Sequence, residues 1–179
     1  MEKIGNVIWI WGMSGSGKTT LGFRLAQELG YTFLDSDSVR RILNIPPDFS
    51  VSGRLEYQTA LRHHVQGLQQ RGVNLVVASI TPMQEMRNQN KALLKNYFEV
   101  YLDCGIDTLI DRDPKGFYKK AFAGEIVEFT GINSPFEKPV IDSRNSVPKL
   151  ILDTGESGEE ICYKILLEAV TKIYRLDKR

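Results

Sequence analysis

The chain has 179 residues, of which 42% are hydrophobic, and its 23 basic residues nearly balance 22 acidic ones, for a formal charge of +1. This size suits a single domain, 1–179, with a proper core. The balance excludes the strong overall charge of a dedicated nucleic-acid or membrane-surface binder, so we expect any anion site to be local and expect neither nucleic acid nor membrane as a partner.

The first residues lead straight into an apolar strand pattern, with no basic and apolar leader and no segment long enough to span a membrane. We therefore expect a cytoplasmic protein. Its two cysteines, Cys104 and Cys162, lie in no CxxC or similar spacing, which favours buried thiols over a metal or redox site.

Strand and helix patterns alternate along the chain. Runs rich in β-branched and aromatic residues, apolar on both faces, predict strands at 6–11, 32–34, 75–79, 98–102 and 150–152. Helical patterns lie between and after them, at 18–29, 36–43, 52–71, 84–94, 106–112, 116–123 and 159–174. The alternation predicts an α/β fold, a doubly wound parallel five-stranded sheet.

The first predicted strand ends in a complete G-x-x-x-x-G-K-[ST] motif, which indicates a phosphate loop. Its glycines let backbone N–H groups surround phosphates, its lysine reaches the β- and γ-phosphates, and its threonine can ligate Mg²⁺. A chance glycine-rich turn is the alternative, but the strand before the motif and the amphipathic helix after it argue against chance. We assign ATP to Gly12, Met13, Ser14, Gly15, Ser16, Gly17, Lys18, Thr19 and Thr20.

Two carboxylates, Asp35 and Asp37, follow the second predicted strand. In parallel sheets, ligands bind beyond the carboxyl ends of the strands, so this pair should face the phosphate loop. We expect Asp37, with Asp35 as second choice, to orient or deprotonate the attacking hydroxyl beside Lys18, and Thr19 with Asp37 to hold Mg²⁺. The alternative reading is an ordinary helix N-cap.

Further candidates flank these motifs. A polar stretch at 112–147 suits a lid that closes over phosphates. Its basic cluster contains Arg112, assigned to ATP, and Lys115, assigned to the acceptor; a solvated helix start is the alternative. Six further residues are assigned to the acceptor, because they can bind an anion, stack on a base, or follow a predicted strand. They are Arg40, Phe49, Arg54, Ile80, Thr81 and Phe129. Phe49 and Phe129 could equally be core residues.

In order and spacing, these motifs resemble the adenylylsulfate kinases over nearly the whole chain. The segment from Arg112 to Glu137 is far more specific than the phosphate loop alone. The resemblance implies a P-loop NTPase fold of the nucleoside monophosphate kinase type. It implies transfer of the ATP γ-phosphoryl group to the ribose 3′-hydroxyl of adenosine 5′-phosphosulfate. It also implies that Arg40 and Arg54 hold the phosphosulfate while Phe49 and Phe129 sandwich the adenine.

The chain departs from the family pattern at several positions. Ser36 replaces the glycine between the two aspartates, and Tyr57, Thr59 and Ala60 replace an asparagine and two arginines. A serine described as a phosphorylated intermediate is Thr81 here, and direct in-line transfer needs no such intermediate. We therefore expect weaker affinity for the adenylylsulfate acceptor than the family pattern implies.

Two alternatives stay open beside the adenylylsulfate reading. A paralogue could phosphorylate another activated nucleotide, such as a cytidine diphosphoramidate. A nucleotide-binding module without turnover is the second alternative, although it would have no chemical need for Lys18, Thr19, Asp35 and Asp37 together. A homodimer is left open.

Overall fold

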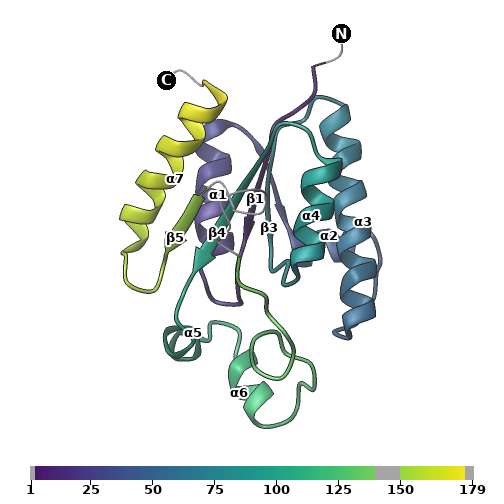
Figure 1. Cartoon of the computed structure of the whole chain (residues 1–179), viewed down its shortest axis with the longest axis vertical. Helices are drawn as coiled ribbons and strands as arrows, with labels where there is room; N and C mark the ends of the chain where they lie inside the picture. The colour runs from purple at the N-terminus through teal and green to yellow at the C-terminus, as the bar shows by residue number, and fades with distance from the viewer. Residues whose placement is uncertain (1–2, 140–149, 176–179) are drawn as a thin grey trace.

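The computed structural model describes residues 3–139 and 150–175, in which five parallel strands form one sheet with the order β2-β3-β1-β4-β5 (Figure 1). The strands are β1 (Val7–Trp11), β2 (Thr32–Asp35), β3 (Leu75–Ser79), β4 (Tyr97–Asp103) and β5 (Leu150–Asp153). The predicted doubly wound parallel sheet is confirmed, because helices cover both of its faces.

The helices are α1 (Lys18–Leu29), α2 (Ser36–Ile42), α3 (Val51–Gln70), α4 (Gln84–Leu93), α5 (Ile106–Arg112), α6 (Phe117–Phe122) and α7 (Glu159–Tyr174). Every boundary lies within one residue of its predicted position. Local signals explain this agreement: the Ser50 hydroxyl caps α3 by accepting from the Gly53 N–H at 3.0 Å, and Gly30 ends α1 in the left-handed conformation.

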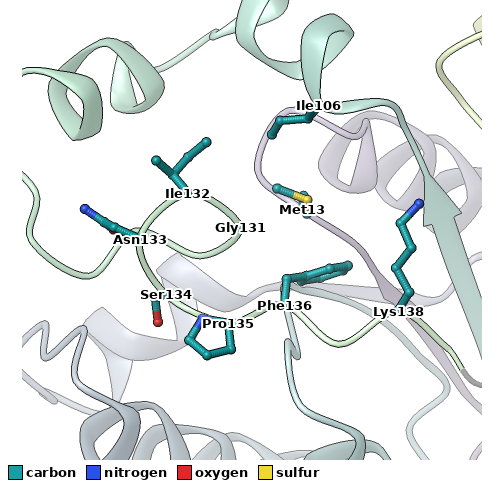
Figure 2. Close-up of a pocket in the computed structure, with 9 residues that line it drawn as sticks. All are labelled: Met13, Ile106, Gly131, Ile132, Asn133, Ser134, Pro135, Phe136 and Lys138. Atoms are coloured by element: carbon teal, nitrogen blue, oxygen red, sulfur yellow. The ribbon is translucent and has the colours of Figure 1, made fainter.

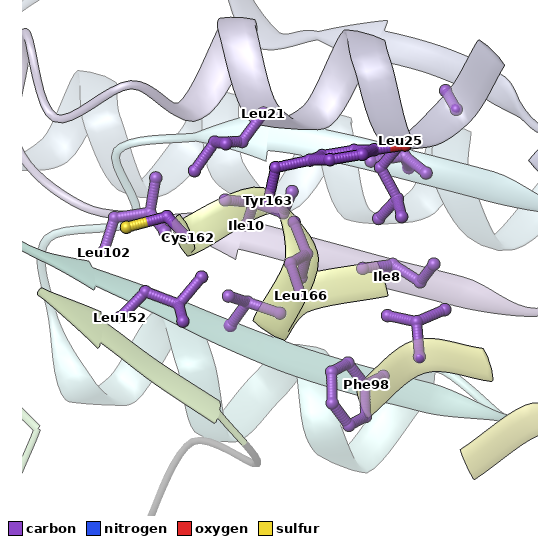
Figure 3. Close-up of a cluster of buried hydrophobic side chains, with 14 residues drawn as sticks. Ile8, Ile10, Leu21, Leu25, Phe98, Leu102, Leu152, Cys162, Tyr163 and Leu166 are labelled. Atoms are coloured by element: carbon purple, nitrogen blue, oxygen red, sulfur yellow. The ribbon is translucent and has the colours of Figure 1, made fainter. Parts of the chain in front are cut away.

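Strand β1 is buried along its whole length and divides its side chains between two cores. Ile8 and Ile10 pack with α1 and α7 on one face (Figure 3). Val7, Trp9 and Trp11 pack on the other face, with side chains of α2 and α3. This alternation follows from the two-residue period of a strand, and it holds β1 rigidly where it delivers the chain to the phosphate loop.

The edge strands correct one prediction. All five strands were expected to be apolar and buried on both faces, but Thr32 on β2 and Ile151 on β5 are exposed, whereas every residue of β1 and β3 is buried. A strand at the edge of a sheet has one neighbour instead of two, and the covering helices do not extend fully over it. The two cysteines are buried and free, as predicted.

Helices α5 and α6 lie beyond the carboxyl ends of the strands, at the lower end of Figure 1. Helix α6 belongs to the predicted lid, 112–147, and α5 ends at the first residue of that segment. Residues 140–147 of the lid lie outside the described residues. None of the helices within residues 3–139 and 150–175 is long and apolar enough to cross a membrane.

Candidate active site

The phosphate loop joins the end of β1 to the start of α1. Gly12 is required there because the loop backbone passes close to β4. A Cβ at this position would lie 2.6 Å from the carbonyl oxygen of Leu102. Gly17, with φ of 91°, precedes the first residue of α1, and no side chain caps that helix. The loop therefore presents the positive end of α1 at the carboxyl edge of the sheet.

Lys18 is half-buried at this edge, where its Nζ donates to the carbonyl oxygen of Met13 at 2.6 Å. Burial lowers the pKa of Lys18 from 10.5 to about 7; the charge of Lys115 adds to that lowering, and Asp35 and Asp37 oppose it. A phosphate beside Lys18 would favour the charged form, so this amine is suited to an anionic ligand.

Asp35 makes two contacts from the end of β2. Its Oδ1 accepts from the backbone N–H of Asp37 at 3.1 Å, which caps α2, and its Oδ2 accepts from the Thr19 hydroxyl at 3.0 Å. The helix-cap reading of this residue is confirmed, and the cap leaves Oδ2 beside the phosphate loop. The predicted metal pair was Thr19 with Asp37, but the structure places Asp35 beside Thr19.

Asp37 lies in the first turn of α2 and faces the lid. Its Oδ2 is 2.8 Å from the Nζ of Lys115, and both side chains are more than half exposed. The structure thus brings Lys18, Thr19, Asp35, Asp37 and Lys115 to one edge of the sheet, as the sequence predicted. Within the described ranges there is no cluster of three or more histidine, cysteine or acidic side chains that would bind a metal alone.

Arg40 is stacked on a tyrosine that is not among the predicted site residues. Its guanidinium carbon lies 3.7 Å from the ring centroid of Tyr57, and its NH1 donates to the carbonyl oxygen of Pro46 at 3.0 Å. The Tyr57 hydroxyl donates to the carbonyl oxygen of Ser36 and accepts from the Ser36 hydroxyl at 3.2 Å. Ser36 and Tyr57, two of the departures noted in the sequence, are therefore in contact.

Arg54 is buried and bound to the lid. Its guanidinium donates to the hydroxyl of Ser134 at 2.6 Å and to the carbonyl oxygen of Glu128. Burial lowers the pKa of Arg54. In the structure this arginine joins α3 to the segment 128–134, so its predicted anion contact would have to be made in addition to these bonds or in exchange for them.

The lid is attached to the phosphate loop through Tyr118, whose hydroxyl donates to the carbonyl oxygen of Ser14 at 2.9 Å. Asp113 holds the first turn of α6 by accepting from the backbone N–H groups of Tyr118 and Lys119, at 3.1 and 3.0 Å. Phe129 is buried in the same cluster, edge-on to Tyr118 with 4.9 Å between ring centroids. Phe49, its predicted stacking partner, is 55% exposed in the loop before α3.

Arg112, predicted to bind ATP, is the last residue of α5 and reaches the residue that follows β5. It donates to the carbonyl oxygen of Thr154 at 2.6 Å. The Thr154 hydroxyl in turn donates to the carbonyl oxygen of Ser16 in the phosphate loop, at 3.0 Å. Thr154 is a residue that the sequence analysis missed, although it follows a predicted strand in the same way as Asp35 and Thr81.

Thr81, predicted on the acceptor side with Ile80, is fully buried with φ of 46°. Its hydroxyl accepts from the indole N–H of Trp9 at 2.9 Å, and its carbonyl oxygen accepts from Arg87 at 3.1 Å. Ile80, the preceding residue, is half-buried. The Thr81 hydroxyl therefore points into the packed sheet and stabilises the end of β3.

A cavity of about 620 Å³ lies between the phosphate loop and the segment 131–138. Figure 2 shows Met13 and Ile106 across from Ile132, with Phe136 and Lys138 at one side. Gly131, with φ of 87°, lets the chain pass close to the Met13 side chain. The cavity is large enough for a small-molecule ligand and opens beside the candidate site.

Comparisons with known proteins agree on one family. Residues 4–144 match the family model described as adenylylsulphate kinase. A probable adenylyl-sulfate kinase of Bacillus subtilis is 39% identical over 172 residues, covering 92% of this chain and 84% of the relative. An adenylyl-sulfate kinase of Bacillus licheniformis is 40% identical over 172 residues with the same coverage.

A solved structure shows the same similarity in three dimensions. The APS kinase of Mycobacterium tuberculosis, in complex with AMPPNP and APS, superposes with a TM-score of 0.81 and 34% identity. The superposition covers 94% of this chain and 98% of the other.

Proposed function

The chain belongs to the adenylylsulphate kinase family, and on that premise we propose that it is an ATP-dependent kinase of sulfate assimilation. It transfers the γ-phosphoryl group of ATP to the ribose 3′-hydroxyl of adenosine 5′-phosphosulfate, which gives 3′-phosphoadenylylsulfate and ADP. The observation that carries this proposal is the position of four side chains at one edge of the sheet: Lys18, Asp35, Asp37 and Lys115. All four lie within the segment 4–144 that matches the family model.

On the donor side, the backbone N–H groups of residues 12–17 and the start of α1 surround the phosphates of ATP. Lys18 exchanges its bond to Met13 for the β- and γ-phosphate oxygens. Its charge then opposes the negative charge that builds up on the β–γ bridging oxygen as the bond to phosphorus breaks. Arg112, the last residue of α5, is bonded to the carbonyl oxygen of Thr154, and we assign it to the nucleotide beyond the phosphates.

The residues at the phosphate loop fit a bound Mg²⁺. Thr19 and Asp35 supply two oxygens 3.0 Å apart, and oxygen is the ligand atom that this ion prefers. Thr19 and Asp35 would hold the ion or its waters, and Asp37, the residue predicted from sequence, lies two residues further along, in the first turn of α2. When bound, Mg²⁺ neutralises charge on the phosphate oxygens.

Asp37 is our choice for the group that orients the acceptor hydroxyl and takes its proton as the oxygen attacks the γ-phosphorus. It is exposed at the edge of the sheet and paired to the lid through Lys115. Lys115 supplies a positive charge beside the same point, so its ion pair with Asp37 has to open or shift when the substrates bind.

On the acceptor side, Arg40 and Arg54 supply guanidinium groups for the anionic phosphosulfate, and Phe49, Phe129 and Ile80 line its approach. Thr81, predicted beside them, is buried with its hydroxyl bonded to Trp9 and supports the end of β3 instead. The cavity beside Met13 and Phe136 adds an apolar wall of the kind that a nucleotide base requires. Phe129 packs against Tyr118, so it offers the base only the part of its ring that the lid cluster leaves open.

A second candidate acceptor is another activated nucleotide, such as a cytidine diphosphoramidate. It is favoured by the bulk of Tyr57, which fills the space between α2 and α3, and by Thr59 and Ala60, which lack the length and charge of arginine. Loss of polar contacts to an acceptor weakens discrimination among acceptors.

The deciding experiment measures ADP release from ATP and Mg²⁺ with adenylylsulfate and with a panel of other activated nucleotides. We expect turnover of adenylylsulfate, with a KM above that of a relative that keeps the asparagine and two arginines. Turnover of a different nucleotide with none of adenylylsulfate would establish the second candidate. ATP binding without turnover of any acceptor would indicate a nucleotide-binding module.

A homodimer and a cytoplasmic location remain predictions. The mass of the protein in solution, measured by light scattering, tests the first, and fractionation of cells tests the second.

A further inference from the structure

Tyr57 lies on α3 with its side chain 3% exposed, between two segments that carry candidate site residues. Its ring faces Arg40, and its hydroxyl reaches the first residue of α2. Tyr57 belongs to the apolar cluster of Val39 and Leu61, and it also contacts Arg40 and the turn that bears Asp35 and Asp37.

The ring contact restricts Arg40. The guanidinium carbon is 3.7 Å from the ring centroid, well within the 6 Å range of a cation–π interaction. The bond from NH1 to the Pro46 carbonyl oxygen, at 3.0 Å, restricts the same group from the loop side. A guanidinium that is stacked and bonded in this way keeps one plane, which suits recognition of an anion by two parallel hydrogen bonds.

The hydroxyl contact restricts the carboxylates. Ser36 is the first residue of α2 and separates Asp35 from Asp37 in the chain. Tyr57 donates to its carbonyl oxygen and accepts from its hydroxyl at 3.2 Å. Burial raises the pKa of Tyr57, so the hydroxyl keeps its proton and can donate. Rotation of this peptide would move both carboxylates, and the tyrosine opposes that rotation.

We propose that Tyr57 is a positioning residue of the acceptor site, whose ring orients Arg40 toward the anionic group of the acceptor and whose hydroxyl holds the Asp35–Asp37 turn. This inference rests on the proposed function, in which Arg40 binds the acceptor and a carboxylate takes its proton. One side chain thereby fixes the distance between the group that binds the acceptor anion and the group that acts on its hydroxyl.

Two substitutions separate the two contacts. Tyr57→Phe keeps the ring and removes the hydroxyl, so we expect kcat to fall about fivefold while the acceptor KM changes less than about twofold. Tyr57→Leu also removes the ring, so the acceptor KM should rise about tenfold. The KM for ATP should stay within about twofold in both variants, because the bond between Thr19 and Asp35 beside the phosphate loop does not involve Tyr57.

The matched control is Tyr174→Phe. This hydroxyl also donates to backbone carbonyl oxygens, those of Val7 and Asn96, but it lies at the amino ends of the strands, away from the site. Thermal denaturation without ligands measures the stability cost of each variant. A Tyr57→Phe protein that loses stability like the control, with unchanged kcat, would overturn the role of the hydroxyl. A Tyr57→Leu protein with an unchanged acceptor KM would overturn the role of the ring.

A double-mutant cycle tests whether the ring acts through Arg40. We expect Arg40→Ala and Tyr57→Leu together to raise the acceptor KM no more than about twofold beyond Arg40→Ala alone. Fully additive effects would overturn the ring's role. If Tyr57→Leu fails to fold, Tyr57→Met replaces it in the cycle and tests the ring, while Tyr57→Phe still tests the hydroxyl.

The cycle uses whichever nucleotide the wild-type protein phosphorylates. If the wild-type protein phosphorylates another nucleotide but not adenylylsulfate, the proposed substrate is contradicted and the cycle can still be measured. A wild-type protein that phosphorylates no nucleotide contradicts the proposed function and the inference with it.

Discussion

The Nζ of Lys115 lies 2.8 Å from the Oδ2 of Asp37 and so connects the lid to the first turn of α2. The two residues come from opposite sides of the nucleotide site, and the pair is largely exposed to solvent. An exposed pair of this kind adds little to stability, so it can open at low cost when substrates enter.

Replacing Lys18 by Ala should reduce turnover at least ~100-fold, because the charge of this residue acts on the β–γ bridge as the bond breaks. The fold should persist, since the only bond that the structure describes for its amine is to Met13. Steady-state ADP release measures the effect. Lys172→Ala, at an exposed position of α7, is the control and should behave as wild type. Near-normal turnover of Lys18→Ala would mean that this loop does not bind the transferred phosphate.

ATP affinity should fall as the pH rises from 7 to 9. The pKa of Lys18 is about 7 without ligand, so above that pH the amine is mostly neutral and ATP binding has to take up a proton. Affinity should therefore drop by up to about tenfold per pH unit, as proton linkage requires. Calorimetric titration at constant ionic strength measures it.

Lys115→Ala provides the control for that pH dependence. Removing its positive charge raises the pKa of Lys18, because Lys115 is the second cause of the lowering after burial. The fall in ATP affinity should then begin at higher pH. Identical pH profiles for the variant and the wild type would mean that the charge of Lys115 does not reach Lys18.

Asp35→Asn separates helix capping from chemistry, because asparagine caps a helix as well as aspartate does. We expect near wild-type thermal stability and a large loss of turnover, since the amide neither takes a proton nor binds Mg²⁺ strongly. Asp37→Asn should also lose turnover, with little change in ATP affinity. Asp107→Asn in the first turn of α5 is the control. Unchanged rates in both site variants would make Asp35 and Asp37 helix-terminus residues only.

Arg40→Ala and Arg54→Ala should differ in their effect on the stability of the fold. Arg40→Ala should mainly raise the acceptor KM, at a cost of about 2 kcal/mol for a lost charge-assisted contact. Arg54→Ala should also destabilise the fold by about 1–3 kcal/mol, because the carbonyl oxygen of Glu128 loses a buried donor. Kinetics and denaturant unfolding of both variants check this. If both variants bound ATP more weakly and kept the acceptor KM of the wild type, the two arginines would be assigned to ATP instead of the acceptor.

Local features of the sequence were enough to predict the helices, the strands and the place of the phosphate loop between β1 and α1. The phosphate loop is contiguous, its glycines are needed by local backbone geometry, and strand and helix periods depend on residues a few positions apart. The family resemblance was confirmed by a match over residues 4–144. The rule that polar residues after parallel strands form the site correctly placed Asp35 beside Thr19, and applied once more it would have found Thr154, but Thr81 is buried under the same sheet edge.

Tertiary structure decided which side chains meet across the site. That Thr19 contacts Asp35 rather than Asp37, that Arg54 binds the lid, and that Tyr57 touches Ser36 depend on the angle between α2 and α3 and on the position of the lid. Such contacts join segments separated by many residues, and no local period encodes them. Packing sets these distances because buried side chains fill a close-packed interior, in which one helix can move only if its neighbours move as well.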